Sequence, residues 1–111
     1  MKKGFVALAV VFMLLFASFA ADARVIMIHN GTGFDLYAIH ISDSGYDDWE
    51  EDLLGNDILE AGESLRVTVH GGYEYFDLLA TDMQGTSVAW FELPGNASRI
   101  TIYADGTAAV Q

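Results

Sequence analysis

The feature that most constrains the fold is a series of short apolar runs, most of them followed by glycine, asparagine or aspartate. Several runs alternate, and in one of them Leu65, Val67 and Val69 share a face opposite polar neighbours. Alternation with a period of two is typical of half-buried strands, and the residues between the runs favour turns. Seven strands are therefore predicted, at residues 24–30, 34–42, 64–70, 73–82, 86–93, 97–104 and 107–111.

Closely spaced strands without a long helical pattern predict an all-β fold, an antiparallel β-sandwich, with a small closed barrel as the alternative. The turn sequence Asn-Gly-Thr-Gly at 30–33 predicts that the first two strands form a hairpin. One short helical turn is expected near 47–54. Asp47 is a suitable N-cap with Glu50 three residues later, and Gly55 suits the end of the turn.

The first 23 residues are expected to be a signal peptide, outside the folded domain. Lys2 and Lys3 precede an uncharged apolar segment, and small residues follow at cleavage spacing. Cleavage is predicted after Ala20 or Ala23, which leaves one domain at 24–111, and an uncleaved N-terminal anchor is the alternative. Such a chain is expected to be a bacterial protein exported to the periplasm or the extracellular space.

The expected mature domain is strongly acidic and contains no cysteine. After position 23 the sequence has 15 acidic residues and three arginines. Binding of phosphate groups needs a basic surface, so nucleic acid is excluded as a partner, and no stable membrane insertion is expected after cleavage. The absence of cysteine excludes disulfides, thiol catalysis and thiolate metal sites. Cationic partners, divalent ions and neutral ligands remain.

The most charged stretch is SDSGYDDWEEDLLG at 42–55, between two predicted strands. Its candidate binding residues, expected to be exposed, are Asp43, Tyr46, Asp47, Asp48, Glu50 and Glu51. Its structural anchors are expected to be Trp49, Leu53, Leu54 and Gly55. The stretch thus combines an apolar part that packs on the sandwich with an acidic rim that a ligand or partner can contact.

Carboxylates at this density suit Ca²⁺, which takes six to eight oxygen ligands, and the candidate ligands are Asp43, Asp47 and Asp48. Their spacing matches no calcium-loop motif, however. No cofactor is therefore expected, and binding of calcium or a small ligand at the acidic loop 43–52 is kept as the alternative function.

Catalysis has weaker support. The histidines, which lack the spacing of a zinc site, are His29, His40 and His70. The pairings that could serve acid–base or nucleophilic chemistry are His70 with Glu74 or Asp77, Ser42 or Ser64 as a nucleophile, and Asp48 with Asp52. No nucleophile elbow or other catalytic frame accompanies them. The protein is therefore predicted not to be an enzyme, and a hydrolytic enzyme is the remote alternative.

Several motifs together resemble a family of small exported bacterial β domains of unknown function. They are N-G-T-G at 30–33, Ser42, W-x-x-D-x-L-G at 49–55, L-x-x-G-E-S at 59–64, and Asp77-Leu78. One departure is Glu50, because such domains often have glycine directly after the tryptophan. The resemblance implies a secreted β domain and implies no particular activity.

The sequence as a whole predicts an exported β-sandwich that acts as a non-catalytic binding or protein–protein interaction module. The partner is expected to be an unidentified protein or envelope component, contacted through the acidic stretch and a sheet edge. The oligomeric state is left open.

Overall fold

The computed structural model describes residues 24–69 and 73–111 of the 111-residue chain. The expected signal peptide at 1–23 and the predicted strand end at His70 lie outside the described residues. Within the described part of the chain, no helix is long and apolar enough to cross a membrane.

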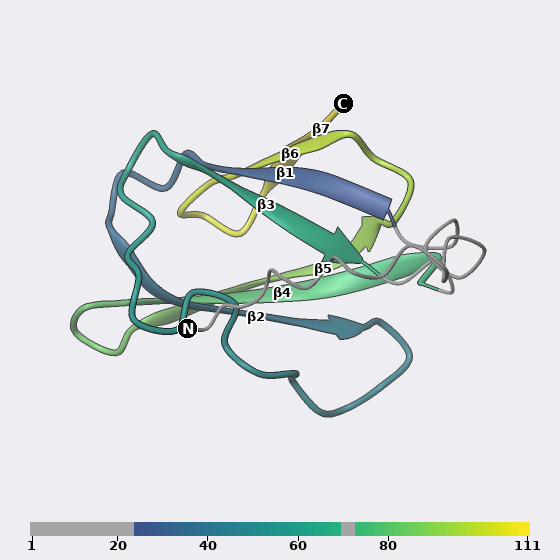
Figure 1. Cartoon of the computed structure of the whole chain (residues 1–111), viewed down its shortest axis with the longest axis horizontal. Helices are drawn as coiled ribbons and strands as arrows, with labels where there is room; N and C mark the ends of the chain where they lie inside the picture. Colours follow the sequence, from purple (N-terminus) through teal and green to yellow (C-terminus); the bar gives the residue numbers. More distant parts are fainter. Residues whose placement is uncertain (1–23, 70–72) are drawn as a thin grey trace, which may run out of the picture.

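The described residues form seven strands in two sheets (Figure 1). The strands are β1 (Arg24–Asn30), β2 (Leu36–Asp43), β3 (Ser64–Val69), β4 (Tyr75–Asp82), β5 (Ser87–Pro94), β6 (Arg99–Ile102) and β7 (Ala108–Val110). One sheet has the order β3-β1-β6-β7 and the other the order β2-β4-β5. The two sheets lie one above the other in Figure 1, which is the predicted sandwich. All neighbouring strands are antiparallel except β1 and β6, which are parallel.

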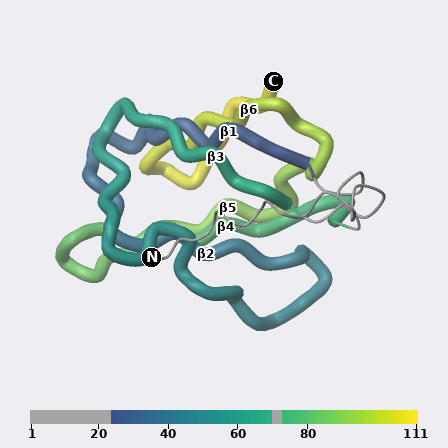
Figure 2. The backbone as a smooth tube through the Cα atoms, viewed as in Figure 1, coloured from purple at the N-terminus to yellow at the C-terminus, as the bar shows by residue number. Residues whose placement is uncertain are grey.

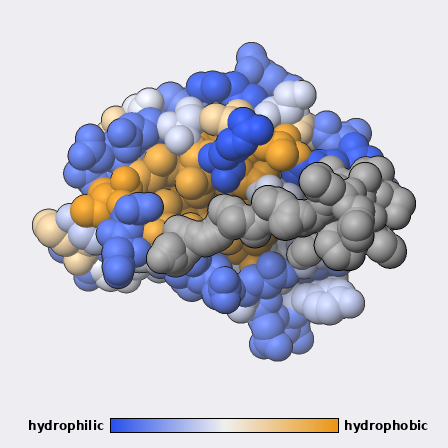
Figure 3. All heavy atoms as spheres, viewed as in Figure 1, coloured by the Kyte–Doolittle hydropathy of each residue, from blue (hydrophilic) through white to orange (hydrophobic). Residues whose placement is uncertain are grey.

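The core fills the space between the sheets with alternating side chains from both layers. Ile28 on β1 and Ile100 on β6 are neighbours in the register and are fully buried. Phe76 and Trp90 are the largest fully buried side chains of the opposite sheet. Burial of large apolar side chains is the main source of stability in a domain without disulfides. Figure 3 shows apolar atoms between the layers, with mostly hydrophilic atoms above and below them.

The predicted hairpin between the first two strands is wrong, because β1 and β2 belong to different sheets. The side chain of Asn30, at the end of β1, is 1% exposed and donates to the carbonyl oxygens of Phe34 and Leu59, at 2.8 and 3.0 Å. Its Oδ1 accepts from the backbone N and hydroxyl of Thr32, at 3.0 and 2.6 Å. This network satisfies a buried amide and turns the chain from one sheet to the other.

Gly31 contributes to the same crossover. Its N–H donates to the carbonyl oxygen of Ile102, 2.9 Å away. A Cβ at Gly31 would lie 3.0 Å from that oxygen and 3.0 Å from Cγ2 of Thr101, so a larger residue would push the turn away from β6. The turn sequence therefore serves a corner between two sheets.

The predicted helical turn near 47–54 is also wrong, since the described residues contain no helix. The connection between β2 and β3 loops outward and then returns along the outer edge of β2 (Figure 2). Glu50 N donates to Ile41 O at 2.9 Å, and Leu53 N donates to Ile39 O at 2.7 Å. Backbone groups of an edge strand need partners, and here the extended segment supplies them in place of a helical turn.

Two further contacts complete this cover over β2. Asp52 Oδ1 accepts from the backbone N–H groups of Ile39 and Leu54, at 2.9 and 3.0 Å. Leu36 and Leu59 form an isolated antiparallel bridge with two backbone hydrogen bonds of 2.9 Å. The edge of β2 is thus largely occupied by the chain's own connection, which removes it as a free edge for a partner strand.

Candidate binding site on the acidic loop

The acidic loop, residues 43–52, is fixed at both ends. At its start, Ser44 N donates to Tyr75 O at 3.2 Å, and Ser44 Oγ donates to Asp77 Oδ1 at 2.7 Å. At its end, His40 Nδ1 lies 2.7 Å from Glu50 O, so the ring nitrogen carries the proton and donates it to that carbonyl oxygen. The residues between these ends therefore project from a defined base at the end of β2.

The side chain of Glu50 also binds the segment just before β4, the strand beside β2 in the sheet. Its carboxylate accepts a hydrogen bond from the hydroxyl of Tyr73, which precedes β4. This bond, partial burial, and the negative charges of Glu50 and Asp43 raise the pKa of Tyr73 to about 12 from its ordinary value of 10.0. The neutral phenol is therefore the form that holds the loop against β4.

The outer part of the loop is exposed. Tyr46 is 73% exposed, and Asp47, Asp48 and Glu51 are also exposed. The side chains of these three acids have no hydrogen bond or ion pair with other described residues. Within residues 24–69 and 73–111 they are therefore carboxylates without a structural partner, close in sequence to an exposed aromatic ring.

The expected anchors of the loop divide into two kinds. Leu54 is 4% exposed in the core, Leu53 packs against the core, and Gly55 has the positive φ of 58° that favours glycine. Trp49 differs from the expectation, since it is 37% exposed. Without the helical turn, Trp49 and Leu53 are not held on one face, and only Leu53 reaches the core.

The candidate metal ligands share no hydrogen-bond partner among the described residues. Asp43 Oδ1 accepts from the backbone N of Gly45 at 3.4 Å, and Asp47 and Asp48 are exposed. In residues 24–69 and 73–111, no group of three or more His, Asp or Glu side chains is close enough to hold a metal ion. The described part of the loop therefore holds no cluster of three carboxylates that would mark a calcium site.

Of the candidate catalytic residues, His70 lies outside the described residues, so its pairing with Glu74 or Asp77 stays a prediction, and the described ones lie on different strands and loops. Ser64 Oγ lies 2.9 Å from His29 Nδ1, as their direct pairing across β1 and β3 requires, but neither residue lines a described hollow. Ser42 is 4% exposed and donates to Asp43 O. Among the described residues no third side chain is hydrogen-bonded to this Ser–His contact, which is typical of a cross-strand pair.

Asp77, another candidate for acid–base chemistry, has a structural role. It is 9% exposed and lies at a register shift between β4 and β5. Its Oδ1 accepts from Glu92 N at 2.9 Å and from Ser44 Oγ, so it holds both the irregularity in the sheet and the start of the acidic loop. Asp52, proposed above as a partner of Asp48, is likewise bound to backbone groups of Ile39 and Leu54.

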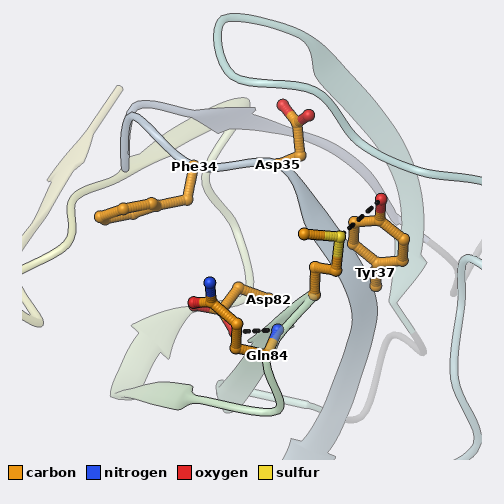
Figure 4. Close-up of a pocket in the computed structure, with 6 residues that line it drawn as sticks. Phe34, Asp35, Tyr37, Asp82 and Gln84 are labelled. Carbon is orange, nitrogen blue, oxygen red and sulfur yellow. Dashed lines mark hydrogen bonds between the residues drawn. The ribbon is translucent and has the colours of Figure 1, made fainter.

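Sequence reasoning missed an apolar region at the opposite end of β2. Phe34, which precedes β2, and Met83, in the turn between β4 and β5, are 58% and 68% exposed and line one hollow (Figure 4). The signal in the sequence was a large apolar residue at each of two polar turns, where solvent-facing residues are the rule.

The comparisons with known proteins support the fold. No protein-family model matches this chain, and no curated protein matches it. Among solved structures, the chain is similar to the NMR structure of a protein from Eubacterium rectale, with a TM-score of 0.54 and 17% sequence identity. The similarity covers 83% of this chain and 89% of the other. At this identity it shows that the two chains share a β fold.

Proposed function

We propose that this protein is an exported, non-catalytic binding module that holds a cationic segment of a protein or envelope partner on its acidic loop. The observation that supports this most directly is the division of the carboxylates. Glu50 and Asp52 bind the fold, whereas Asp47, Asp48 and Glu51 are exposed and unused beside Tyr46. Unused carboxylates on a fixed base attract cations at little ordering cost.

The two aromatic residues of the loop suit the same partner. Tyr46 and Trp49 are 73% and 37% exposed and adjoin the three free acids in sequence. Lysine and arginine side chains bind both carboxylates and the faces of tyrosine and tryptophan rings. The net charge of −11 for the whole chain, which becomes more negative when Lys2 and Lys3 are removed, favours encounter with a basic segment.

A titration with a short oligo-lysine peptide tests this proposal, measured by calorimetry at low and at physiological salt. We expect binding that weakens with salt and that is lost in the variant Asp47→Asn/Asp48→Asn/Glu51→Gln. The matched control is Asp57→Asn/Glu60→Gln/Glu92→Gln, which removes the same charge from exposed acids elsewhere. Equal weakening in both variants would show a general charge effect and would reject the loop as the site.

A pull-down from envelope extract then identifies the natural partner. The wild-type protein and the charge-matched control should recover the same partner, and the loop variant should not. Recovery of that partner by the loop variant would contradict the proposed role of Asp47, Asp48 and Glu51.

A further inference from the structure

An apolar hollow of about 200 Å³ opens near the beginning of β2, between the sheet β2-β4-β5 and the connections that follow β1 and β6. Its apolar lining comes from three strands of one sheet, and the residues are Leu36, Ala80, Val88 and Trp90. Thr32 and Ala104 line it from the connections that follow β1 and β6. The indole N–H of Trp90 donates to Thr107 O at 3.0 Å, which fixes the ring in the wall.

Exposed apolar side chains lie at the rim of this hollow. Phe34 borders both this hollow and an adjacent one of about 170 Å³, which Tyr37 and Met83 also line (Figure 4). The Tyr37 hydroxyl lies 3.7 Å from the Met83 sulfur. Aromatic and methionine side chains gathered around a hollow are typical of surfaces that bind a partner, whereas scattered exposed apolar residues are ordinary.

The size of the hollow restricts its occupant. A site that encloses a free small molecule usually has about 300 Å³ or more and buries most of the ligand. The present hollow is smaller than that and open on one side, which suits a single ring or branched aliphatic group held by contacts beyond the hollow itself. A side chain of a longer polypeptide gains contacts outside the hollow, because the residues next to it in that polypeptide would lie against Phe34 and Met83.

The charge around the hollow restricts the neighbours of that side chain. Asp82 lines both hollows and Asp35 lines the adjacent one. Each uses one oxygen for backbone N–H groups, Asp82 for Gln84 and Thr86 and Asp35 for Ala61. Both side chains are acidic, and the described surface carries few cations to offset them. Lysine or arginine beside the inserted group complements this rim.

We propose that the hollow receives one aromatic or branched aliphatic side chain of a partner polypeptide whose adjacent residues are basic. The site is separate from the acidic loop: Leu36 lies at one end of β2 and Asp43 at the other, eight residues of extended strand or roughly 25 Å apart. A partner that reaches both sites would be held at two points along β2.

The test uses isotope-labelled protein, nuclear magnetic resonance, and the peptides Lys-Lys-Phe-Lys-Lys, Lys-Lys-Ala-Lys-Lys and Glu-Glu-Phe-Glu-Glu. We expect the first peptide alone to shift the Trp90 indole signal and the amides of Ala80 and Val88. The variant Phe34→Ser/Met83→Ser should weaken this binding about tenfold, from lost apolar contact. Phe91→Ser is the matched control, because Phe91 is 65% exposed and lies outside the hollow.

Equal shifts from the alanine peptide, or no shift at these residues with any peptide, would overturn the proposal. So would toluene shifting the same signals while Lys-Lys-Phe-Lys-Lys does not, since the hollow would then take a free small molecule. The variant Asp47→Asn/Asp48→Asn/Glu51→Gln separates the two sites. A phenylalanine-dependent shift at Trp90 should persist in that variant, whatever the outcome for the acidic loop, and its loss there would count against a separate site.

Discussion

The connection between β2 and β3 has an outer part, residues 46–48, and a returning part, residues 50–54, that lies along β2. Both parts are rich in acidic residues, but these acids have different roles. In the outer part, Asp47 and Asp48 are exposed and bind nothing in the described fold. In the returning part, Asp52 accepts two backbone hydrogen bonds, one from the fully buried Ile39. The difference is that the returning part lies against the edge of β2, where unpaired N–H groups need an acceptor.

This contrast shows that a run of acids is not one feature. Asp52 binds the edge of β2, whereas Asp47, Asp48 and Glu51, the last directly beside Asp52 in sequence, are exposed and remain for a partner.

Replacing the buried anchor should have the largest effect on stability. Leu54→Ala is expected to lower the unfolding free energy by about 2–5 kcal/mol, because Leu54 is 4% exposed and its removal leaves a cavity. Trp49→Ala should cost less than Leu54→Ala, because Trp49 keeps more than a third of its surface in solvent and its removal leaves no closed cavity. Urea denaturation measures both. Equal losses would mean that Trp49 is an anchor after all.

Removing the edge carboxylate should have the next largest effect. Asp52→Ala leaves the N–H groups of Ile39 and Leu54 without their acceptor, which is expected to cost about 1–3 kcal/mol. Asp48→Ala, the matched change in the outer part, should stay within about 0.5 kcal/mol of wild type. The same denaturation experiment compares them, and a comparable loss in both variants would erase the distinction between the two parts.

The Tyr73–Glu50 bond should appear in the pH dependence of stability. The pKa of Tyr73 is raised to about 12 in the fold from 10.0, so between these values the folded state keeps a proton that the unfolded state has released. The stability that this bond contributes is therefore complete below pH 10.0 and is lost as pH rises toward 12.

Tyr73→Phe tests this directly. The variant should lack this part of the decline in unfolding free energy above pH 10.0, while the wild type shows it. Tyrosinate absorbance during an alkaline titration gives an independent measure, with one tyrosine fewer ionising late in the variant. Identical pH profiles would show that the bond does not hold the loop.

Calcium should have the smallest effect. Millimolar Ca²⁺ is expected to leave the melting temperature unchanged, because no three acidic side chains of the described loop are grouped closely enough to hold the ion. A thermal scan with and without the ion measures this, with Mg²⁺ as the control for ionic strength. A rise specific to calcium would favour the alternative of a calcium-binding loop.

Much of the fold followed from local patterns in the sequence. Val67 and Val69 are buried as their alternation predicts, and Gly62, Gly85 and Gly106 have positive φ at predicted turns. The periods and turn residues are local properties of the chain, so they can be recognised without knowing which strands meet. Tyr46, Asp47 and Asp48 are exposed, as their position in a polar stretch between two strands predicts.

Other features depend on contacts between distant residues. Asn30 suits a hairpin turn by type, yet its buried amide binds Leu59, 29 residues away, and directs the chain into the second sheet. Asp47 and Glu50 suit a capping box, yet Glu50 N pairs with Ile41 on β2. In both cases a tertiary hydrogen bond prevailed over a local preference, because a buried polar group must find a partner.

Local residue patterns are enough to predict short strands with defined inner faces and an acidic long connection. Contacts between distant residues set which sheet each strand joins, place the connection on the edge of β2, and leave certain acids exposed. The physical reason is that side-chain periodicity is fixed by neighbouring residues, whereas backbone pairing is fixed by whichever segment reaches an unpaired edge.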